Sequence, residues 1–248
     1  MRVESGGEVW VVSGDYKTTP DPACETFEPV RCHHFITECT FGLPIYRWPK
    51  PEEMFADIHR WWRGNRELGR TSVLFAYALG KSQRLLAGLD ASIGPIGLHG
   101  AVAPFLPLYA EQGIALAAAE KVTAENAKSF KGKGLIIAPG SAQNTPWLRK
   151  FAPYSLAFAS GWMTVRGTRR RGAYDRGFVL SDHCDWPGLL ETVLATGAET
   201  IGVTHGHTAP FIRYLRQEHG LNAYDIPTRF TGETATGEEA DNNAEEDT

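Results

Sequence analysis

The sequence predicts an α/β protein in which short buried strands alternate with helices. Short apolar runs recur along the middle of the chain, and stretches with helical periodicity lie between them. This alternation is typical of βαβ units with parallel strands. The composition agrees, because 42% hydrophobic and 22% charged residues are ordinary for a globular chain. The length of 248 residues is enough to bury a substantial core.

The first expected elements are strands, followed by a helix. Residues 3–12 predict a β-hairpin, because two runs rich in β-formers flank a Ser-Gly-Gly turn at 5–7. A further strand is expected over 33–38. Residues 52–63 then show helical periodicity, which places five apolar side chains on one broad face. These are Met54, Phe55, Ile58, Trp61 and Trp62.

The remaining elements continue the alternation of strand and helix. Buried strands are predicted over 72–77, 93–98, 134–138, 156–159, 178–180 and 200–203. Helices are predicted over 81–89, 186–195 and 209–217.

The charges are distributed unevenly along the chain. Residues 231–248 hold seven acidic side chains and no Lys or Arg, which leaves 25 basic against 22 acidic residues elsewhere. A polar, acidic segment without aromatic residues buries too little apolar surface to order itself. We therefore expect a disordered acidic tail at 231–248. The mildly basic remainder permits a nucleic-acid partner without requiring one.

Several features favour a cytoplasmic protein. No apolar run approaches the roughly 18 residues that a membrane span requires. No apolar region typical of a signal peptide follows Met1. The four cysteines have irregular spacings that match neither a disulfide framework nor a zinc knuckle.

Four side chains suited to metal binding or acid–base chemistry stand at or just after the ends of predicted strands. They are Asp15, Glu38, His183 and His205. Loops at the carboxyl ends of strands form the ligand-binding crevice in layered α/β folds, so we expect these side chains to converge. For each residue alone, the alternative interpretation is a cap of a helix or turn.

The segments around these four residues resemble motifs of one nuclease family, in the family's order. Ser13-Gly14-Asp15-Tyr16-Lys17 is similar to the fourth metal motif of metallo-β-lactamase-fold nucleases. Residues 37–42, 181–186 and 203–207 resemble motifs A, B and C of its β-CASP branch. That branch includes the mRNA 3′-end-processing endonuclease and DNA cross-link repair nucleases. The resemblance covers residues 3–230. The amino-acid sequence of the motifs is most similar to that of bacterial exonucleases associated with a DNA ligase and a helicase.

The resemblance implies a fold and its division into domains. Residues 73–83, 137–140 and 160–163 resemble the start and later loops of an inserted β-CASP domain. The expected architecture is the C-terminal part of a metallo-β-lactamase αββα sandwich interrupted by that insert. The sandwich would comprise residues 1–42 and 178–230, and the insert residues 43–177.

The resemblance also implies a role for each site residue. Asp15 would be the carboxylate that bridges two zinc ions, and His205 an imidazole ligand of the second zinc. His183 would be the general acid or a phosphate-contacting group near the leaving oxygen, and Glu38 would orient and charge His183. Three basic residues before motif B either contact the phosphate backbone or form a solvated turn. They are Arg169, Arg170 and Arg171.

The function implied by the resemblance is zinc-dependent hydrolysis of phosphodiester bonds at DNA ends by a metal-activated water. An ATP-dependent DNA ligase and a helicase are the implied partners. Motifs A to C do not distinguish sugar types, so an RNA-processing nuclease remains an alternative. A non-catalytic module that binds nucleic acid or supports assembly is a second alternative.

The sequence departs from the family pattern at one place. Members carry a His-x-His-x-Asp-His motif and a further lone histidine before the Gly-Asp motif, and this sequence contains neither. Two zinc ions normally take three or four protein donors each. We therefore expect a sandwich without its N-terminal half, an incomplete zinc site, and a chain whose own activity the sequence leaves open.

Overall fold

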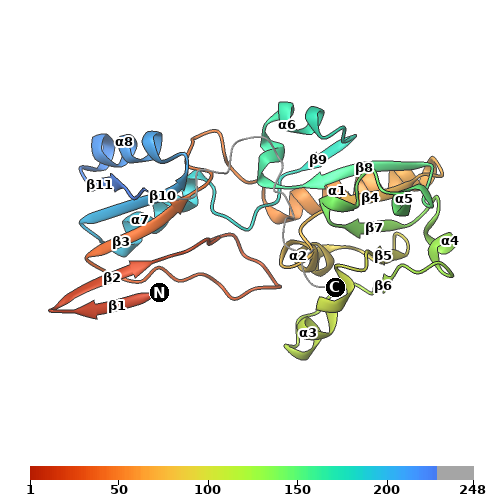
Figure 1. Ribbon diagram of the computed structural model, residues 1–248, viewed down its shortest axis with the longest axis horizontal. Helices are drawn as coiled ribbons and strands as arrows, with labels where there is room; N and C mark the ends of the chain where they lie inside the picture. The colour runs from red at the N-terminus through yellow and green to blue at the C-terminus, as the bar shows by residue number, and fades with distance from the viewer. Residues whose placement is uncertain (228–248) are drawn as a thin grey trace, which may run out of the picture. The chain divides into compact units, whose positions relative to one another are not determined.

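The computed structural model describes residues 1–227, apart from the side chains of Thr168, Arg169 and Arg171. It divides into two compact units. Unit 1 comprises Met1–Asp21, Glu25–Trp48 and the described residues from Ser181 onward, and unit 2 comprises Pro22–Cys24 and Pro49–Leu180. Each unit contains one sheet with parallel strands and helices, so the predicted α/β class is confirmed (Figure 1). The acidic tail predicted at 231–248 lies outside the described residues.

Unit 1 is built on a five-stranded sheet with the order β1-β2-β3-β10-β11 (Figure 1). The first two strands form the predicted antiparallel hairpin, and the other neighbours are parallel. The strands are β1 (Arg2–Ser5), β2 (Glu8–Val12), β3 (His34–Cys39), β10 (Thr200–Gly206) and β11 (Asn222–Asp225). The helices of this unit are α7 (Trp186–Thr196) and α8 (Thr208–His219).

The two faces of this sheet differ in burial. The register sets Val11, Phe35, Ile201 and Ala223 side by side, and all four are buried. They share a core with residues of both helices, namely Leu189, Val193, Phe211, Ile212 and Leu215. The opposite face is more open, because Val3 keeps 50% and Val12 keeps 38% of its surface exposed.

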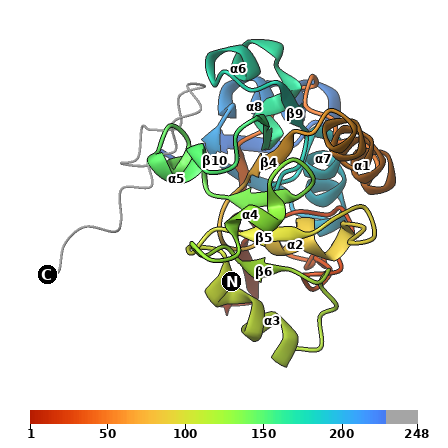
Figure 2. The ribbon, with the colours of Figure 1, turned by 90° about the vertical axis from the view of Figure 1, so that its right-hand side faces the viewer.

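Unit 2 is built on a six-stranded parallel sheet with the order β6-β5-β7-β4-β8-β9 (Figure 1). Figure 2 shows β4, β5, β6 and β9 of this sheet from another side. Its strands are β4 (Thr71–Phe75), β5 (Ile96–Leu98), β6 (Glu120–Lys121), β7 (Leu135–Ala138), β8 (Tyr154–Ala159) and β9 (Arg176–Phe178). The α-helices are α1 (Pro51–Glu67), α2 (Lys81–Gly88), α3 (Leu106–Glu111), α4 (Ala127–Phe130), α5 (Pro146–Arg149) and α6 (Arg166–Arg171). Three short 3₁₀ helices are η1 (Ala103–Phe105), η2 (Gly140–Ala142) and η3 (Gly161–Thr164).

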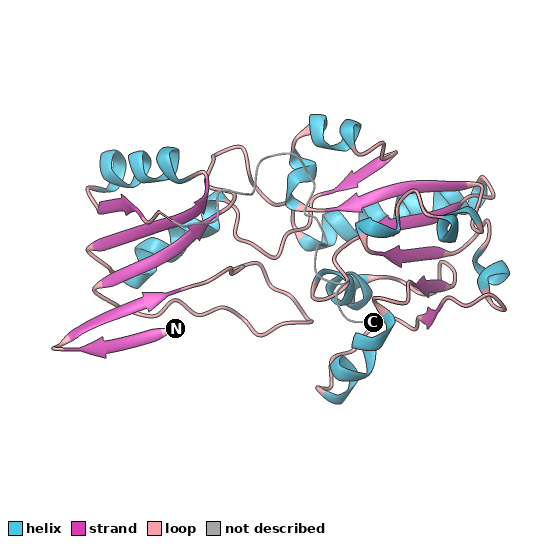
Figure 3. Ribbon diagram, viewed as in Figure 1, coloured by secondary structure: helices cyan, strands magenta, loops and turns pink. Residues whose placement is uncertain are grey.

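Both faces of the second sheet are buried, with helices packed on each (Figure 3). One face, which includes Leu74 and Ile137, packs against the predicted apolar face of α1, where Met54, Ile58 and Trp62 are buried. The other face, which includes Val73 and Ile136, packs against a separate cluster that contains Phe130, Leu148 and Phe151. Strands that are buried on both faces have continuously apolar sequences, and this pattern predicted them.

Three strands differ from the prediction, and one of them, the two-residue β6, was not predicted at all. The strand expected over 178–180 is β9, which ends at Phe178 and pairs with β8 in the sheet of unit 2. A run that is apolar throughout has no alternation to fix where a strand ends, so its pairing partner decides. Strand β11 was also not predicted, because Asn222 and Asp225 at its ends are poor β-formers. The assignment of the two units to a metallo-β-lactamase core and a β-CASP insert stays a prediction. Among the described residues, no helix is long and apolar enough to cross a membrane.

Candidate functional site

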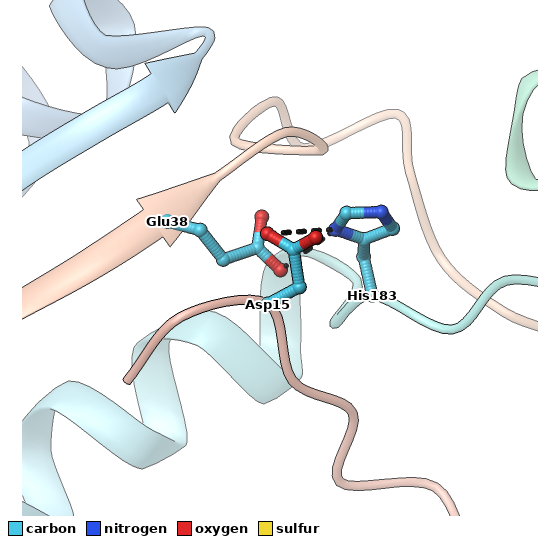
Figure 4. Close-up of side chains that lie close together, drawn as sticks. All are labelled: Asp15, Glu38 and His183. Carbon is cyan, nitrogen blue, oxygen red and sulfur yellow. Dashed lines mark hydrogen bonds and ion pairs between the residues drawn. The ribbon is translucent and has the colours of Figure 1, made fainter. Parts of the chain in front are cut away.

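Asp15, Glu38 and His183 lie together in unit 1 (Figure 4). Each offers one possible ligand atom, and the three atoms lie within 4.8 Å of one another. The residues come from three separate segments: the loop after β2, the strand β3, and the loop before α7. Three of the four strand-end residues singled out from the sequence are therefore neighbours.

Asp15 is held at the surface by the residue that follows it. The Asp15 side chain is 68% exposed, and the chain turns immediately before it at Gly14, whose φ is 64°. Tyr16 is buried, with its hydroxyl 3.1 Å from the Thr37 hydroxyl and its ring stacked on Phe27. Burial raises the pKa of the Tyr16 phenol well above its ordinary value, so the hydroxyl stays protonated for this contact. The buried tyrosine anchors the loop and leaves the Asp15 carboxylate in solvent.

Lys17 connects the Asp15 loop to the loop that carries His183. Its ammonium lies 2.9 Å from the carboxylate of Asp21 and 3.9 Å from that of Asp182. The Lys17 side chain is largely buried, so solvent screens these attractions less than it would at the surface. Lys17 was not among the predicted site residues, although it stands in the same motif as Asp15.

Glu38 is a buried carboxylate whose two oxygens both have partners. Its residue is 2% exposed and lies on β3 opposite Thr204 of β10. Oε2 accepts a hydrogen bond from the Thr40 backbone N–H at 2.8 Å, and Oε1 lies 3.1 Å from Nδ1 of His183. A buried carboxylate is costly unless it is bonded in this way, so Glu38 is fixed in place by its partners.

His183 directs its ring nitrogen Nδ1 at the carboxylates of Glu38 and Asp15. Nδ1 lies 3.1 Å from Oε1 of Glu38 and 4.0 Å from Oδ1 of Asp15. Because an ionised carboxylate only accepts hydrogen bonds, Nδ1 carries a hydrogen and donates it to Glu38. The His183 side chain is 23% exposed. The neighbouring Cys184 is buried, and burial raises the pKa of its thiol to about 12.

His205 is not a member of this group of three and has an unusual backbone conformation. It is exposed at the end of β10, with a φ of 56°, beside an irregularity in the pairing with β3. Its carbonyl accepts a hydrogen bond from the Cys39 thiol. A non-glycine residue in the left-handed region is strained, and such strain is common at functional sites. The metal-capable group found among the described side chains does not include His205, so its role as a ligand stays a prediction.

The arginines predicted to contact phosphates belong to α6 of unit 2. Arg170 is exposed. The side chains of Arg169 and Arg171 lie outside the described part of the chain.

The donors of this group suit a divalent cation, since carboxylate oxygens and imidazole nitrogens bind metals such as zinc. Glu38 is the least suited to direct ligation, because both of its oxygens already accept hydrogen bonds. Asp15 has the most exposed side chain of the three, at 68%. Because Glu38 is already hydrogen-bonded, the group offers fewer open donors than the three or four that a tightly held zinc ion takes from a protein.

Comparison with known proteins gives one relative at moderate identity. No protein-family model matches the chain. A protein of Opitutus terrae named "Probable DNA ligase" is 29% identical to it over 214 residues. The match covers 86% of this chain and 21% of the relative, so the chain spans about a fifth of the length of that protein.

Proposed function

We propose that this chain carries part of the active site of a zinc-dependent nuclease that hydrolyses phosphodiester bonds at DNA ends. The observation that carries the proposal is the imidazole of His183 held between the buried Glu38 and the exposed Asp15. The nuclease would be of the ligase-associated exonuclease type within the β-CASP branch of the metallo-β-lactamase fold. The name of the Opitutus terrae relative supports a link to DNA metabolism.

Four residues have distinct roles in this proposal. Zinc, when bound, supplies an activated water for attack on phosphorus. Asp15 and His205 would hold the metal. His183 donates the proton on Nε2 to the oxygen that leaves phosphorus as the new P–O bond to water forms. The Glu38 carboxylate accepts the hydrogen bond from Nδ1, which orients the ring and stabilises its positive charge.

The proposed substrate is DNA, with a DNA ligase and a helicase as proposed partners. Arg169, Arg170 and Arg171 would contact the phosphate backbone, because a cluster of arginines binds phosphates without reading sequence. Such contacts weaken as the salt concentration rises.

Two substitutions test the division of roles. We expect His183→Ala to lower turnover on end-labelled DNA by about 10²–10⁴-fold while metal content stays nearly unchanged. Asp15→Asn should lose both metal and activity. His219→Ala, which removes a histidine at the end of α8, is the matched control and should change neither.

The assay also separates the alternatives. Equal metal loss in the His183 and Asp15 variants would show that the two roles are assigned wrongly. Cleavage of RNA in place of DNA would redirect the proposal to an RNA-processing nuclease. Binding of DNA with no hydrolysis at any zinc concentration would point to a non-catalytic module.

A further inference from the structure

Two of the segments that connect unit 1 to unit 2, those ending at Trp48 and beginning at Ser181, are hydrogen-bonded to each other inside unit 1. The chain leaves unit 1 after Trp48 and returns at Ser181. The Trp48 indole Nε1–H donates to the His183 carbonyl at 3.0 Å, and the Trp48 backbone N–H donates to Oδ2 of Asp185 at 2.9 Å. The Trp186 N–H donates to the Tyr46 carbonyl at 3.0 Å. We call these three bonds the Trp48 bracket.

Asp185 ties the bracket to the following helix. Its Oδ1 accepts a hydrogen bond from the Gly188 N–H at 3.0 Å, which caps the N-terminus of α7. Its Oδ2 accepts from Trp48. One carboxylate therefore fixes the outgoing segment and the start of α7 together.

The Trp48 bracket holds a segment that contains no helix or strand. Residues 179–185 belong to no helix or strand, and the His183 N–H donates to the Ser181 hydroxyl within the same segment. The His183 imidazole is held by Glu38 at 3.1 Å. The Phe41 ring meets both the Trp48 ring and the His183 ring edge-on, with centroids 4.8 Å and 5.9 Å away. Trp48 therefore contacts the backbone of His183 directly and its ring through Phe41.

We propose that Trp48 is a positioning residue for His183, and this inference rests on the function proposed above. Its indole N–H fixes the carbonyl of the residue whose ring must donate a proton, so the ring is aimed before substrate binds. Trp48 does not itself act on substrate. A reacting group displaced by about 1 Å can cost 10²-fold in rate, so even partial loosening of this loop is measurable.

The test removes the indole N–H of Trp48 in two ways. Trp48→Phe keeps an aromatic ring for Phe41 to pack against, and an isosteric benzothiophene amino acid at position 48 removes only the donor. Trp61→Phe is the matched control, because the Trp61 Nε1–H donates at 3.2 Å to the Ser155 hydroxyl in unit 2. We expect both changes at position 48 to lower kcat about tenfold while KM and the melting temperature stay unchanged. The control should keep the wild-type kcat.

A second readout does not need activity. The Nδ1–H of His183, bonded to Glu38, should give a downfield proton resonance that is absent in His183→Ala. We expect the position-48 variants to broaden it or speed its exchange with water, and Trp61→Phe to leave it unchanged. If wild type cuts no nucleic acid but the resonance responds as stated, the proposed function fails and the positioning role of Trp48 stands. A sharp, unchanged resonance, or an unchanged kcat, in both position-48 variants would overturn the role of Trp48.

Discussion

The two sheets of this protein use parallel strands in different ways. In unit 2, both faces of the sheet are buried, and neighbouring residues such as Ile136 and Ile137 belong to separate cores. In unit 1, the helices share a core with the face that contains Val11, while Val12 on the opposite face is 38% exposed. Parallel sheets are normally covered on both faces. The comparison shows that unit 2 has the usual burial of a parallel sheet, whereas unit 1 combines parallel pairing with an open apolar face.

The candidate site residues also distinguish the two units, because all three belong to unit 1. Asp15 and Glu38 lie at the ends of two strands of unit 1, and His183 precedes a helix of the same unit. Among the described residues of unit 2, no group of His, Cys, Asp and Glu is arranged to hold a metal ion. The unit with the fully buried sheet therefore offers no comparable metal site, and the proposed chemistry depends on the unit with the open face.

The largest expected effect is on stability, and it separates the two sheets directly. Ile136→Ala and Ile137→Ala should each cost about 2–5 kcal/mol in free energy of unfolding, because each leaves a cavity in a buried core. In unit 1, Val11→Ala should cost about 1.5–3 kcal/mol and Val12→Ala clearly less. Urea unfolding followed separately in each unit measures these values. Equal costs at Val11 and Val12 would mean that the second face of the unit 1 sheet is buried in solution.

The next effect concerns metal, and it should follow unit 1 alone. We expect the chain to hold fewer than two zinc ions tightly after dialysis, because few protein donors are present at the site. Asp15→Asn should remove the bound metal, and His99→Asn in unit 2 should not. Metal analysis by mass spectrometry measures both. Two tightly held zinc ions per chain would show that ligands beyond Asp15 and His205 have been missed.

Some of this arrangement could be predicted from the sequence, and some could not. The period of apolar residues located α1 and its buried Met54, because periodicity is a local property of the chain. The pairing of β9 with β8 could not be predicted, since a short apolar run carries no information about its neighbour in a sheet. The convergence of the strand ends followed from a general rule of α/β folds.

The contacts around the site were harder to predict from the sequence than the site residues themselves. Trp48 donates a hydrogen bond to a carbonyl that lies 135 residues further along the chain. Because every residue has a backbone carbonyl, the sequence does not indicate which one accepts. The left-handed conformation of His205 was also not predicted, because only glycine and asparagine commonly signal that region. Such features depend on tertiary packing and not on local residue pattern.

The smallest expected effect is a dependence of stability on pH that arises at the strand ends of unit 2. His99 directly follows β5, where its Nδ1 accepts the Ala101 N–H at 3.1 Å and its ring meets Trp147 at 4.7 Å. Burial, and secondarily the charge of Lys150, lowers the pKa of His99 below its ordinary value of about 6.5. His99 therefore binds a proton less readily in the folded state than in the unfolded chain.

The sign follows from this difference in proton uptake. The unfolded chain binds more protons than the folded chain between the lowered pKa of His99 and about 6.5, so stability rises with pH in that window. Stability should accordingly fall as the pH is lowered from 7.5 through 6.5, and the contribution of His99 should level off below its folded pKa. His99→Asn keeps an acceptor for the Ala101 N–H and removes the titration, so its unfolding free energy should depend less on pH in this range. If wild type and His99→Asn lose stability in parallel on acidification, His99 is not held neutral by its surroundings, and the strand ends of unit 2 are more open to solvent than their burial indicates.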